Sequence, residues 1–346
     1  MPGDLVQSGR NEGDQPAVQM NECNRVAIIG AGHVGATAAY ALMLRALVRE
    51  IVLIDSDTDL AEAEAADLSD ANALARPGRI WAGTYADAAS AKIAIITAGA
   101  ASHGAESRLS LAGRSAEIVS TCVSQLVDAG FAGILLVAAN PVDLMTLVAL
   151  RRSGFSPARV IGTGTLLDSS RLKQTLSGRF GIATEAIEGL VLGEHGDSEV
   201  AAFSTVRIGG LTLEQFSPGG AEIDRGQVGR DVRDAGYQIV LGKGYTSFGV
   251  ATAIVRICEA ILRDERTVLP VSTLLTGQYD ITDVCLSLPC VLGAGGVERI
   301  LTPALEPGET ADLQASGAAL KAAIAATLAD YATAGTPAAR NETSTA

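Results

Sequence analysis

His195 is one of only three histidines in the chain, and it lies between two glycines in the segment Gly193-Glu-His-Gly-Asp-Ser198. An imidazole is neutral near pH 7 and positively charged slightly below it, so it suits a group that gives and takes a proton during turnover. The segment follows the apolar run 190–192. The alternative interpretation is therefore a polar turn after a strand, and residues elsewhere in the chain must distinguish the two.

A second chemical pattern is G-x-G-x-x-G at Gly30, Gly32 and Gly35, with Asp55 twenty residues after the last glycine. The first glycine permits a tight turn, the second lets the backbone approach a pyrophosphate, and the third allows a helix and a strand to pack closely. The free N–H groups at the start of the helix would bind the phosphates. Asp55 would accept hydrogen bonds from the adenosine ribose and would repel a 2′-phosphate. The pattern therefore predicts a site for NAD rather than NADP.

Apolar strands and helices alternate around these residues. Strands are predicted at 25–30, 51–55, 92–97, 133–138 and 159–162, and helices at 36–48, 58–75, 109–129 and 142–153. Apolar strands without alternation, separated by helices, are typical of a parallel sheet covered on both faces. Ligands bind such sheets at the carboxyl ends of the strands. Besides the glycine loop with its His33 and Val34, those ends carry the remaining predicted cofactor residues, which are Asp55, Thr97, Ala98, Gly99 and Asn140.

The pattern changes after about residue 164. Helices are predicted at 166–176, over most of 227–262 with an interruption near 242–244, and at 313–328. Gly209-Gly210 is a hairpin signal, and 268–275 and 281–292 are predicted to be antiparallel strands. We therefore expect an α/β chain with a Rossmann-type doubly wound parallel sheet at 23–164 and an α+β substrate domain at 165–331. Polar tails at 1–22 and 332–346 are predicted to be disordered.

Composition excludes several classes of protein. The net charge of −13 and the lack of a basic stripe argue against nucleic-acid binding. No apolar run reaches the roughly 18 residues of a membrane span, and the N-terminus lacks a signal-peptide pattern. The five cysteines show no CxxC and no metal-ligand spacing, so we interpret them as small buried side chains and predict no metal. A reducing, cytoplasmic location follows.

The motifs belong to an ordered series, which comprises Gly30-Ala-Gly-His-Val-Gly35, Val52-Leu-Ile-Asp55, Thr97-Ala-Gly-Ala100, Glu106-Ser-Arg-Leu109, Ala139-Asn-Pro-Val-Asp143, Gly162-Thr-Gly-Thr-Leu-Leu-Asp-Ser-Ser-Arg171, Gly193-Glu-His-Gly-Asp-Ser198, Lys243-Gly-Tyr-Thr-Ser247, Leu269-Pro-Val-Ser272 and Gly295-Gly-Val-Glu-Arg299. With this series the chain resembles the L-lactate/malate dehydrogenase family over residues 24–330, and it is more similar to the L-lactate members. The resemblance implies reversible hydride transfer between NADH and a 2-oxo acid.

The resemblance also implies a role for each polar residue. His195 would donate and accept the proton, and Asp168 would hydrogen-bond its other ring nitrogen. Arg171 would grip the substrate carboxylate with its two-pronged guanidinium, while Arg108 would polarise the reacting carbonyl. Taken singly, Asp168 and Arg171 could instead be an intrahelical ion pair worth only about 0.3–0.5 kcal/mol, and Arg108 a solvated loop charge.

Two further positions complete the site that the resemblance implies. Asn140 lies at a strand end, where the family uses it near the carbonyl and the nicotinamide. Thr246 matches a position in the substrate pocket.

The chain departs from the family at Ser102, within the segment 101–107 that would form a mobile loop over the substrate. Lactate enzymes carry Gln at this position and malate enzymes carry Arg, and the neighbouring His103 is also unusual. Because Ser leaves volume and adds no charge, we expect a 2-oxo acid with a neutral side chain larger than that of pyruvate. The alternatives are a malate dehydrogenase, which Ser102 disfavours, and a non-catalytic NAD-binding protein, which has no need of a proton donor.

Assembly and regulation are further expectations from the resemblance. Family members form dimers and tetramers, so we expect a homo-oligomer. Relatives activated by fructose bisphosphate place basic residues at an anion site between subunits, and the matching positions here are Lys173 and Glu188. An acid at position 188 would repel a phosphate, so we predict no activation by sugar bisphosphates.

Overall fold

The computed structural model describes residues 25–75, 78–100, 108–217 and 223–327, except for the side chains of 108–110. Within these ranges the central feature is a nine-stranded sheet in the order β11-β10-β9-β6-β5-β4-β1-β2-β3. Its parallel part comprises β1 (Arg25–Ile29), β2 (Glu50–Ile54), β3 (Arg79–Ala82), β4 (Ile93–Ile96), β5 (Ile134–Val137) and β6 (Val160–Gly162). The antiparallel part comprises β9 (Thr267–Thr276), β10 (Thr282–Gly293) and β11 (Gly296–Ile300). The predicted fold class is confirmed.

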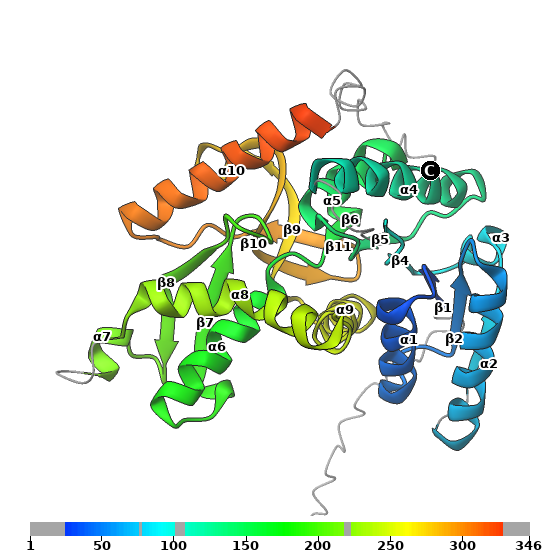
Figure 1. Ribbon diagram of the computed structural model, residues 1–346, viewed down its shortest axis with the longest axis horizontal. Coiled ribbons are helices and arrows are strands. Elements are labelled where there is room, and N and C mark those ends of the chain that lie inside the picture. The colour runs from blue at the N-terminus through cyan, green and yellow to red at the C-terminus, as the bar shows by residue number, and fades with distance from the viewer. Residues whose placement is uncertain (1–24, 76–77, 101–107, 218–222, 328–346) are drawn as a thin grey trace, which may run out of the picture.

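Helices cover both faces of this sheet, as Figure 1 shows. Val26 and Ile28 of β1 pack with α1 (His33–Arg45), α2 (Thr58–Ala75) and α9 (Phe248–Leu262). Ala27 and Ile29, which point the other way, pack with α4 (Arg108–Asp128), α5 (Val142–Ser153) and α10 (Pro307–Thr327). Because alternate residues of one strand are buried on opposite faces, the strand is apolar throughout, which is the pattern that predicted it.

The parallel and antiparallel parts of the sheet meet at one pair of residues, Gly162 of β6 and Ser272 of β9. A Cβ at Gly162 would lie 2.3 Å from the hydroxyl of Thr146 and 2.9 Å from the Cβ of Ser272, so the junction has room only for glycine. The sheet therefore runs unbroken past residue 164, and the division into two domains at that residue stays a prediction.

A smaller sheet pairs β7 (Ile187–Leu192) with β8 (Val200–Ile208), and it packs against α6 (Leu166–Phe180) and α8 (Arg225–Lys243). The edge strands β3 and β11 were not predicted, and β7 was anticipated only through its last three residues, the apolar run 190–192. The glycine pair 209–210 does form a tight turn, closed by a hydrogen bond from the N–H of Ile208 to the carbonyl of Leu211. The chain then enters the short helix α7 (Leu213–Phe216) rather than a strand, because Thr212 caps that helix.

Short elements complete the described chain: α3 (Tyr85–Ala88) and the 3-10 turns Pro157–Arg159, Thr184–Ala186 and Gln278–Asp280. No helix in the described ranges is both long enough and apolar enough to span a bilayer. The predicted tails 1–22 and 332–346 lie outside the described residues.

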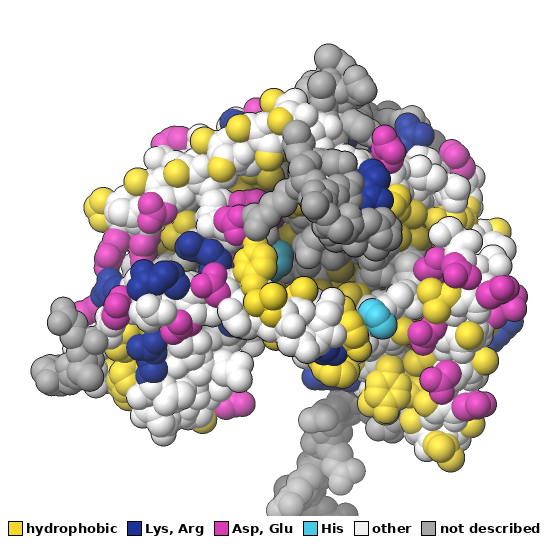
Figure 2. Space-filling model, in the orientation of Figure 1, with side chains coloured by type: hydrophobic (Ala, Val, Ile, Leu, Met, Phe, Trp, Pro, Cys, Tyr) yellow, Lys and Arg dark blue, Asp and Glu magenta, His cyan; other side chains and the backbone are white. Residues whose placement is uncertain are grey.

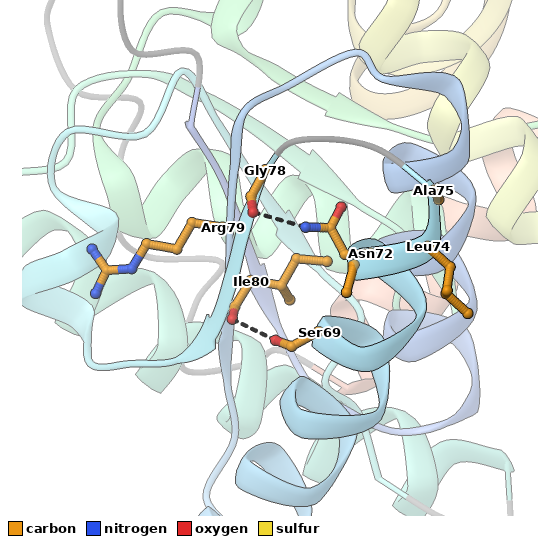
Figure 3. Close-up of a pocket in the computed structure, with 8 residues that line it drawn as sticks. Ser69, Asn72, Leu74, Ala75, Gly78, Arg79 and Ile80 are labelled. Carbon is orange, nitrogen blue, oxygen red and sulfur yellow. Dashed lines mark hydrogen bonds between the residues drawn. The ribbon is translucent and has the colours of Figure 1, made fainter.

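A cavity of about 630 Å³ lies between the end of α2 and the edge strand β3 (Figure 3). Two polar side chains that line it are already paired, since Ser69 donates to the carbonyl of Ile80 and Asn72 donates to that of Gly78. It lies at the β3 edge of the sheet, whereas the segment with His195 follows β7 in the other sheet. This cavity is therefore separate from the segment that carries His195.

Candidate active site

The segment Gly193–Ser198 follows β7 and is held by two elements that come later in the chain. Gly193 has a φ of +88° and exchanges two backbone hydrogen bonds of 3.0 Å with Ser287 of β10. The N–H of Glu194 donates to the hydroxyl of Ser316 on α10 at 3.0 Å. A Cβ at Gly193 would lie 2.9 Å from the same hydroxyl, so a close approach as well as the positive φ requires glycine here. The backbone that carries His195 is thus fixed from two sides.

His195 is fixed a third time, against the carboxyl edge of the parallel sheet. Its backbone N–H donates to Oδ2 of Asp143 at 2.7 Å. Asp143 lies in the first turn of α5, which follows β5 and Asn140. This bond places the histidine beside the strand ends where the predicted cofactor residues lie.

The side chains of His195, Asp168 and Arg171 meet, as the sequence predicted. His195 Nδ1 lies 2.6 Å from Oδ2 of Asp168, and Arg171 Nη1 donates to the other carboxylate oxygen at 2.7 Å. Asp168 is only 1% exposed, whereas the His195 side chain is 28% exposed. Because a carboxylate accepts hydrogen bonds, Nδ1 must carry a proton, which leaves Nε2 as the ring nitrogen that can exchange one.

The surrounding charges decide the protonation of the histidine. Burial disfavours its charged form, but the hydrogen bond and charge of Asp168, with smaller contributions from Asp143 and Glu199, outweigh burial and raise the pKa of His195 to about 9. The pKa of Asp168 is lowered, because His195 and Arg171 together outweigh its burial. The pair is therefore an ionised carboxylate and a protonated ring at neutral pH.

Glu199 is a neighbour that sequence reasoning did not single out. It is 7% exposed, and its Oε1 has no hydrogen-bond partner among the described residues. Burial and the charge of Asp168 raise the pKa of Glu199 to about 8, against the opposing effects of His195, Arg233 and Arg171. The sequence gives one weak signal for this residue: an acid placed directly after the histidine segment and before the apolar Val200.

Asp143 is the last residue of the motif 139–143, and the sequence alone does not indicate its role. It is the one acid in a helical segment, 142–150, in which every residue is buried, and that pattern was readable in the sequence. Burial raises its pKa to about 6, although the Ser272 hydroxyl and the His195 N–H lower it. A buried carboxyl that holds the catalytic backbone is a positioning residue by its contacts.

His195, Asp168 and Glu199 also offer ligand atoms within 4.8 Å of one another, as a metal site would. Both oxygens of Asp168 already accept hydrogen bonds, however, from His195 and from Arg171. The positive charges of Arg171 and Arg233 also act on Glu199 and lower its pKa. We therefore interpret the group as a unit for proton transfer and anion binding rather than as a cation site.

The glycine loop has the shape that a dinucleotide needs. Gly30 has a φ of +106°, and a Cβ there would lie 2.6 Å from the backbone nitrogen of Ala98. A Cβ at Gly35 would lie 1.9 Å from the carbonyl oxygen of Gly30, so both positions exclude a side chain. Gly32, in contrast, faces open space at the start of α1, where no side chain caps the helix. The N–H groups at a helix start without a side-chain cap are free to bind a phosphate.

Asp55 and Thr97 lie against this loop. The Ala31 N–H donates to Asp55 Oδ2 at 2.6 Å, which holds the carboxylate at the end of β2 beside the loop. Thr97 donates to the carbonyls of Ile29 and Gly30 at 3.1 and 2.8 Å. The adenosine end of the predicted site is thus assembled from the ends of three adjacent strands, β1, β2 and β4.

The remaining predicted residues fall at or near the carboxyl edge or outside the described side chains. Ala98 is half-buried and Gly99 exposed after β4, Asn140 is exposed after β5, and Val34 is half-buried in the first turn of α1. Thr246 is half-buried between α8 and α9. Arg108 is the first residue of α4, and its side chain is not described; Ser102, His103 and the segment 101–107 lie outside the described residues.

The side chain of His33 makes its contact outside the glycine loop. It is the first residue of α1, and its ring stacks on Tyr245 from the segment between α8 and α9, with ring centroids 3.8 Å apart. Nothing in the local sequence pairs the two residues. The contact joins the loop predicted to bind the cofactor to the segment that contains Thr246.

Comparison with known proteins identifies the family. Residues 24–162 match the family described as lactate/malate dehydrogenase, NAD binding domain, and residues 165–330 match lactate/malate dehydrogenase, alpha/beta C-terminal domain. An L-lactate dehydrogenase of Acetivibrio thermocellus is 40% identical over 304 residues, which are 87% of this chain and 96% of the relative. An L-lactate dehydrogenase of Thermus aquaticus is 40% identical over 306 residues, which are 87% of this chain and 99% of the relative.

Solved structures agree with the sequence relatives. The structure of the minor L-lactate dehydrogenase from Enterococcus mundtii in a ligand-bound form has a TM-score of 0.85 at 35% identity, covering 87% of this chain and 97% of that chain. A lactate dehydrogenase from a deep-sea metagenome library also has a TM-score of 0.85, at 38% identity, covering 88% of this chain and 98% of that chain. These matches span both halves of the sheet and the segments on which the site is built. The chain therefore belongs to the lactate/malate dehydrogenase family, and its cofactor is NAD.

Proposed function

We propose that the protein is an NAD-dependent L-2-hydroxy-acid dehydrogenase of the lactate dehydrogenase type, which interconverts a 2-oxo acid and its hydroxy acid. The observation that carries the proposal is the joint contact of His195 and Arg171 with one buried carboxylate, Asp168, at 2.6 and 2.7 Å. That contact brings a proton donor and an anion-binding group to the same place, and a protein that only binds NAD needs neither.

The chemistry divides between cofactor and chain. Bound NADH supplies a hydride to the carbonyl carbon. His195 gives the proton at Nε2 to the carbonyl oxygen, so the C=O double bond becomes C–H and O–H. Asp168 keeps the ring charged until that transfer and holds it in orientation, as its short bond to Nδ1 indicates. In the reverse reaction the neutral ring accepts the hydroxyl proton.

The arginines and the residues near the strand ends would orient the substrate. Arg171 uses Nη1 for Asp168, so its remaining guanidinium N–H groups are available for the substrate carboxylate. The Arg171 side chain is 15% exposed, which keeps such a contact largely away from water. Arg108 would polarise the carbonyl, and Asn140 and Thr246 would line the site near the nicotinamide. These roles are proposals that rest on family resemblance and position.

We further propose a substrate with a neutral side chain larger than the methyl of pyruvate. Ser102 supports this by its size and lack of charge, and Gly236 of α8 supports it independently. A Cβ at Gly236 would lie 3.7 and 3.8 Å from the two terminal nitrogens of Arg171. A side chain would fit at position 236 without strain, beside the Arg171 guanidinium that we propose binds the substrate carboxylate. Because this position is glycine, volume is left there for the substrate.

A panel of 2-oxo acids tests both parts of the proposal. We expect NADH oxidation with 2-oxobutyrate or 2-oxo-isocaproate at a higher kcat/KM than with pyruvate, and little turnover of oxaloacetate. A preference for oxaloacetate would contradict the substrate proposal. His195→Ala should abolish turnover while NADH still binds, which separates an enzyme from a binding protein. Ser102→Gln should favour pyruvate and Ser102→Arg should favour oxaloacetate.

We also propose that the protein is a homo-oligomer in a reducing, cytoplasmic compartment. Exposed apolar side chains gather over α1, α8 and α9 (Figure 2), and they include Leu241 and Phe248, which are 80% and 70% exposed. A patch of this kind is typical of a surface that another subunit covers. The four described cysteines are buried free thiols, as a reducing compartment permits. Light scattering should give a dimer or tetramer, and Leu241→Glu should lower the mass.

A further inference from the structure

The ring of His33 stacks on that of Tyr245, with the centroids 3.8 Å apart and the ring planes inclined by 14°. His33 follows Gly32 in the loop that binds the dinucleotide, and Tyr245 directly precedes Thr246. The motif explains the glycines of this loop, but it asks only for backbone from residue 33. The histidine side chain is therefore free to make another contact, and its ring contacts the segment between α8 and α9.

Lys243 fixes the Tyr245 side of this contact. Its ammonium lies 4.3 Å from the centroid of the Tyr245 ring and 4.0 Å from that of Phe248. It also donates a hydrogen bond of 3.1 Å to the hydroxyl of Ser247, a residue that is 4% exposed. Lysine and aromatic rings attract each other through the ring quadrupole. The Lys243 ammonium thus contacts both neighbours of Thr246, Tyr245 and Ser247.

The stack lies at one end of a longer contact between α1 and α9. At the other end of these helices Arg45 pairs with Glu259 at 3.2 Å, and the faces between them are apolar. His33 is the first residue of α1, and Tyr245 lies three residues before α9 begins. Any shift of the glycine loop on binding a dinucleotide therefore acts directly on the segment that carries Thr246.

We propose that the His33–Tyr245 stack is a clasp that couples cofactor binding to the position of Thr246, which makes His33 and Tyr245 positioning residues for the substrate. The inference rests on the proposed function, since it assigns a role to side chains around the same site. It predicts that a change in the substrate-side residue alters NADH affinity, and that a change in the cofactor-side residue alters the substrate KM.

A double-mutant cycle on the full-length protein tests the clasp. His33→Ala, Tyr245→Ala and the double variant are compared by NADH fluorescence titration and by kcat and KM for the best 2-oxo acid. An aromatic pair of this kind should be worth about two- to tenfold in NADH Kd and in KM. We expect each single variant to show that loss, the double variant to lose no more than one of them, and kcat to change less than KM. Additive losses would overturn the proposal.

His33→Phe distinguishes stacking from any other use of the histidine. It keeps a flat ring and should recover most of the NADH affinity and KM that His33→Ala loses; equal losses in both variants would overturn the clasp. Leu74→Ala, which removes a 94% exposed apolar side chain from α2, outside the apolar patch over α1, α8 and α9, is the control and should change neither constant. Melting temperatures show whether each variant is folded. If the unaltered protein neither binds NADH nor reduces any 2-oxo acid, the proposed function fails; if it does both and the variants match it, only the clasp fails.

Discussion

Replacing Asp168 by Asn removes the charge that keeps His195 protonated. In the unaltered protein the hydrogen bond and charge of Asp168 outweigh the burial of the ring and raise the pKa of His195 to about 9. Without that carboxylate, burial should bring the pKa to the ordinary value of about 6.5 or below it. At a pH of about 7.5 the protonated fraction would then fall from nearly all to about one tenth or less. Because reduction consumes this proton, kcat/KM for the 2-oxo acid should fall by at least about tenfold at that pH.

The pH profile of kcat/KM is the assay that exposes the cause. Reduction needs the charged ring, so activity of the unaltered protein should be full at low pH and should be lost as pH rises through about 9. In Asp168→Asn the same loss should occur as pH rises through about 6.5 or lower. The loss of kcat/KM caused by Asp168→Asn should therefore be smallest at low pH and should grow towards neutral pH. Oxidation of the hydroxy acid needs the neutral ring, so its rising limb should move in the same direction.

A matched control removes a carboxylate that does not contact the histidine. Asp231 pairs with Arg179, another arginine of α6, at 3.0 Å on the surface. Asp231→Asn should leave both limbs of the profile unchanged. The reasoning would be refuted if Asp168→Asn lost activity by the same factor at every pH, because the carboxylate would then act through geometry alone. It would also be refuted if the falling limb stayed near pH 9.

Three further outcomes are expected. Glu199→Gln should lower the midpoint of the falling limb by less than Asp168→Asn does, because the Glu199 charge raises the pKa of His195 less than Asp168 does; an unchanged midpoint in a pH profile would contradict this. Gly236→Ala should shift the ratio of kcat/KM values from 2-oxo-isocaproate towards pyruvate, since the added methyl would lie 3.7 Å from the Arg171 guanidinium; a panel of 2-oxo acids measures it. Fructose 1,6-bisphosphate should leave the pyruvate saturation curve in place, because Glu188 is exposed on β7 and would repel phosphate; a shift to lower pyruvate concentrations would disprove this.

The parts of the molecule that sequence predicts well are those fixed by short-range patterns. The glycine loop and Asp55 are tied to strand ends, and strand ends are readable because a buried strand is an uninterrupted apolar run. The pairing of Asp168 with Arg171 follows from helical spacing alone. Gly35 is an example of such a signal. A Cβ at this position would lie 1.9 Å from the carbonyl oxygen of Gly30, so only glycine fits.

Contacts between distant segments could not be predicted in this way. The raised pKa of Glu199 comes from its burial and from the charge of Asp168, and the residues next to it in the sequence predict neither. The stack of His33 on Tyr245 depends on how α1 packs against α9, which only the assembled sheet determines. The edge strand β3 was missed because its sequence, Arg79–Ala82, is only partly buried and lacks a long apolar run.

The charges around His195 explain why one ring can serve both directions of the reaction. Three carboxyl groups, Asp168, Asp143 and Glu199, favour the charged ring, and burial alone opposes it. An arriving 2-oxo acid brings a further negative charge, so binding and protonation reinforce each other. The hydroxyl of a hydroxy acid, in contrast, must give its proton to the ring. Oxidation therefore requires the neutral ring, and the balance between the two directions should follow pH around the pKa of about 9.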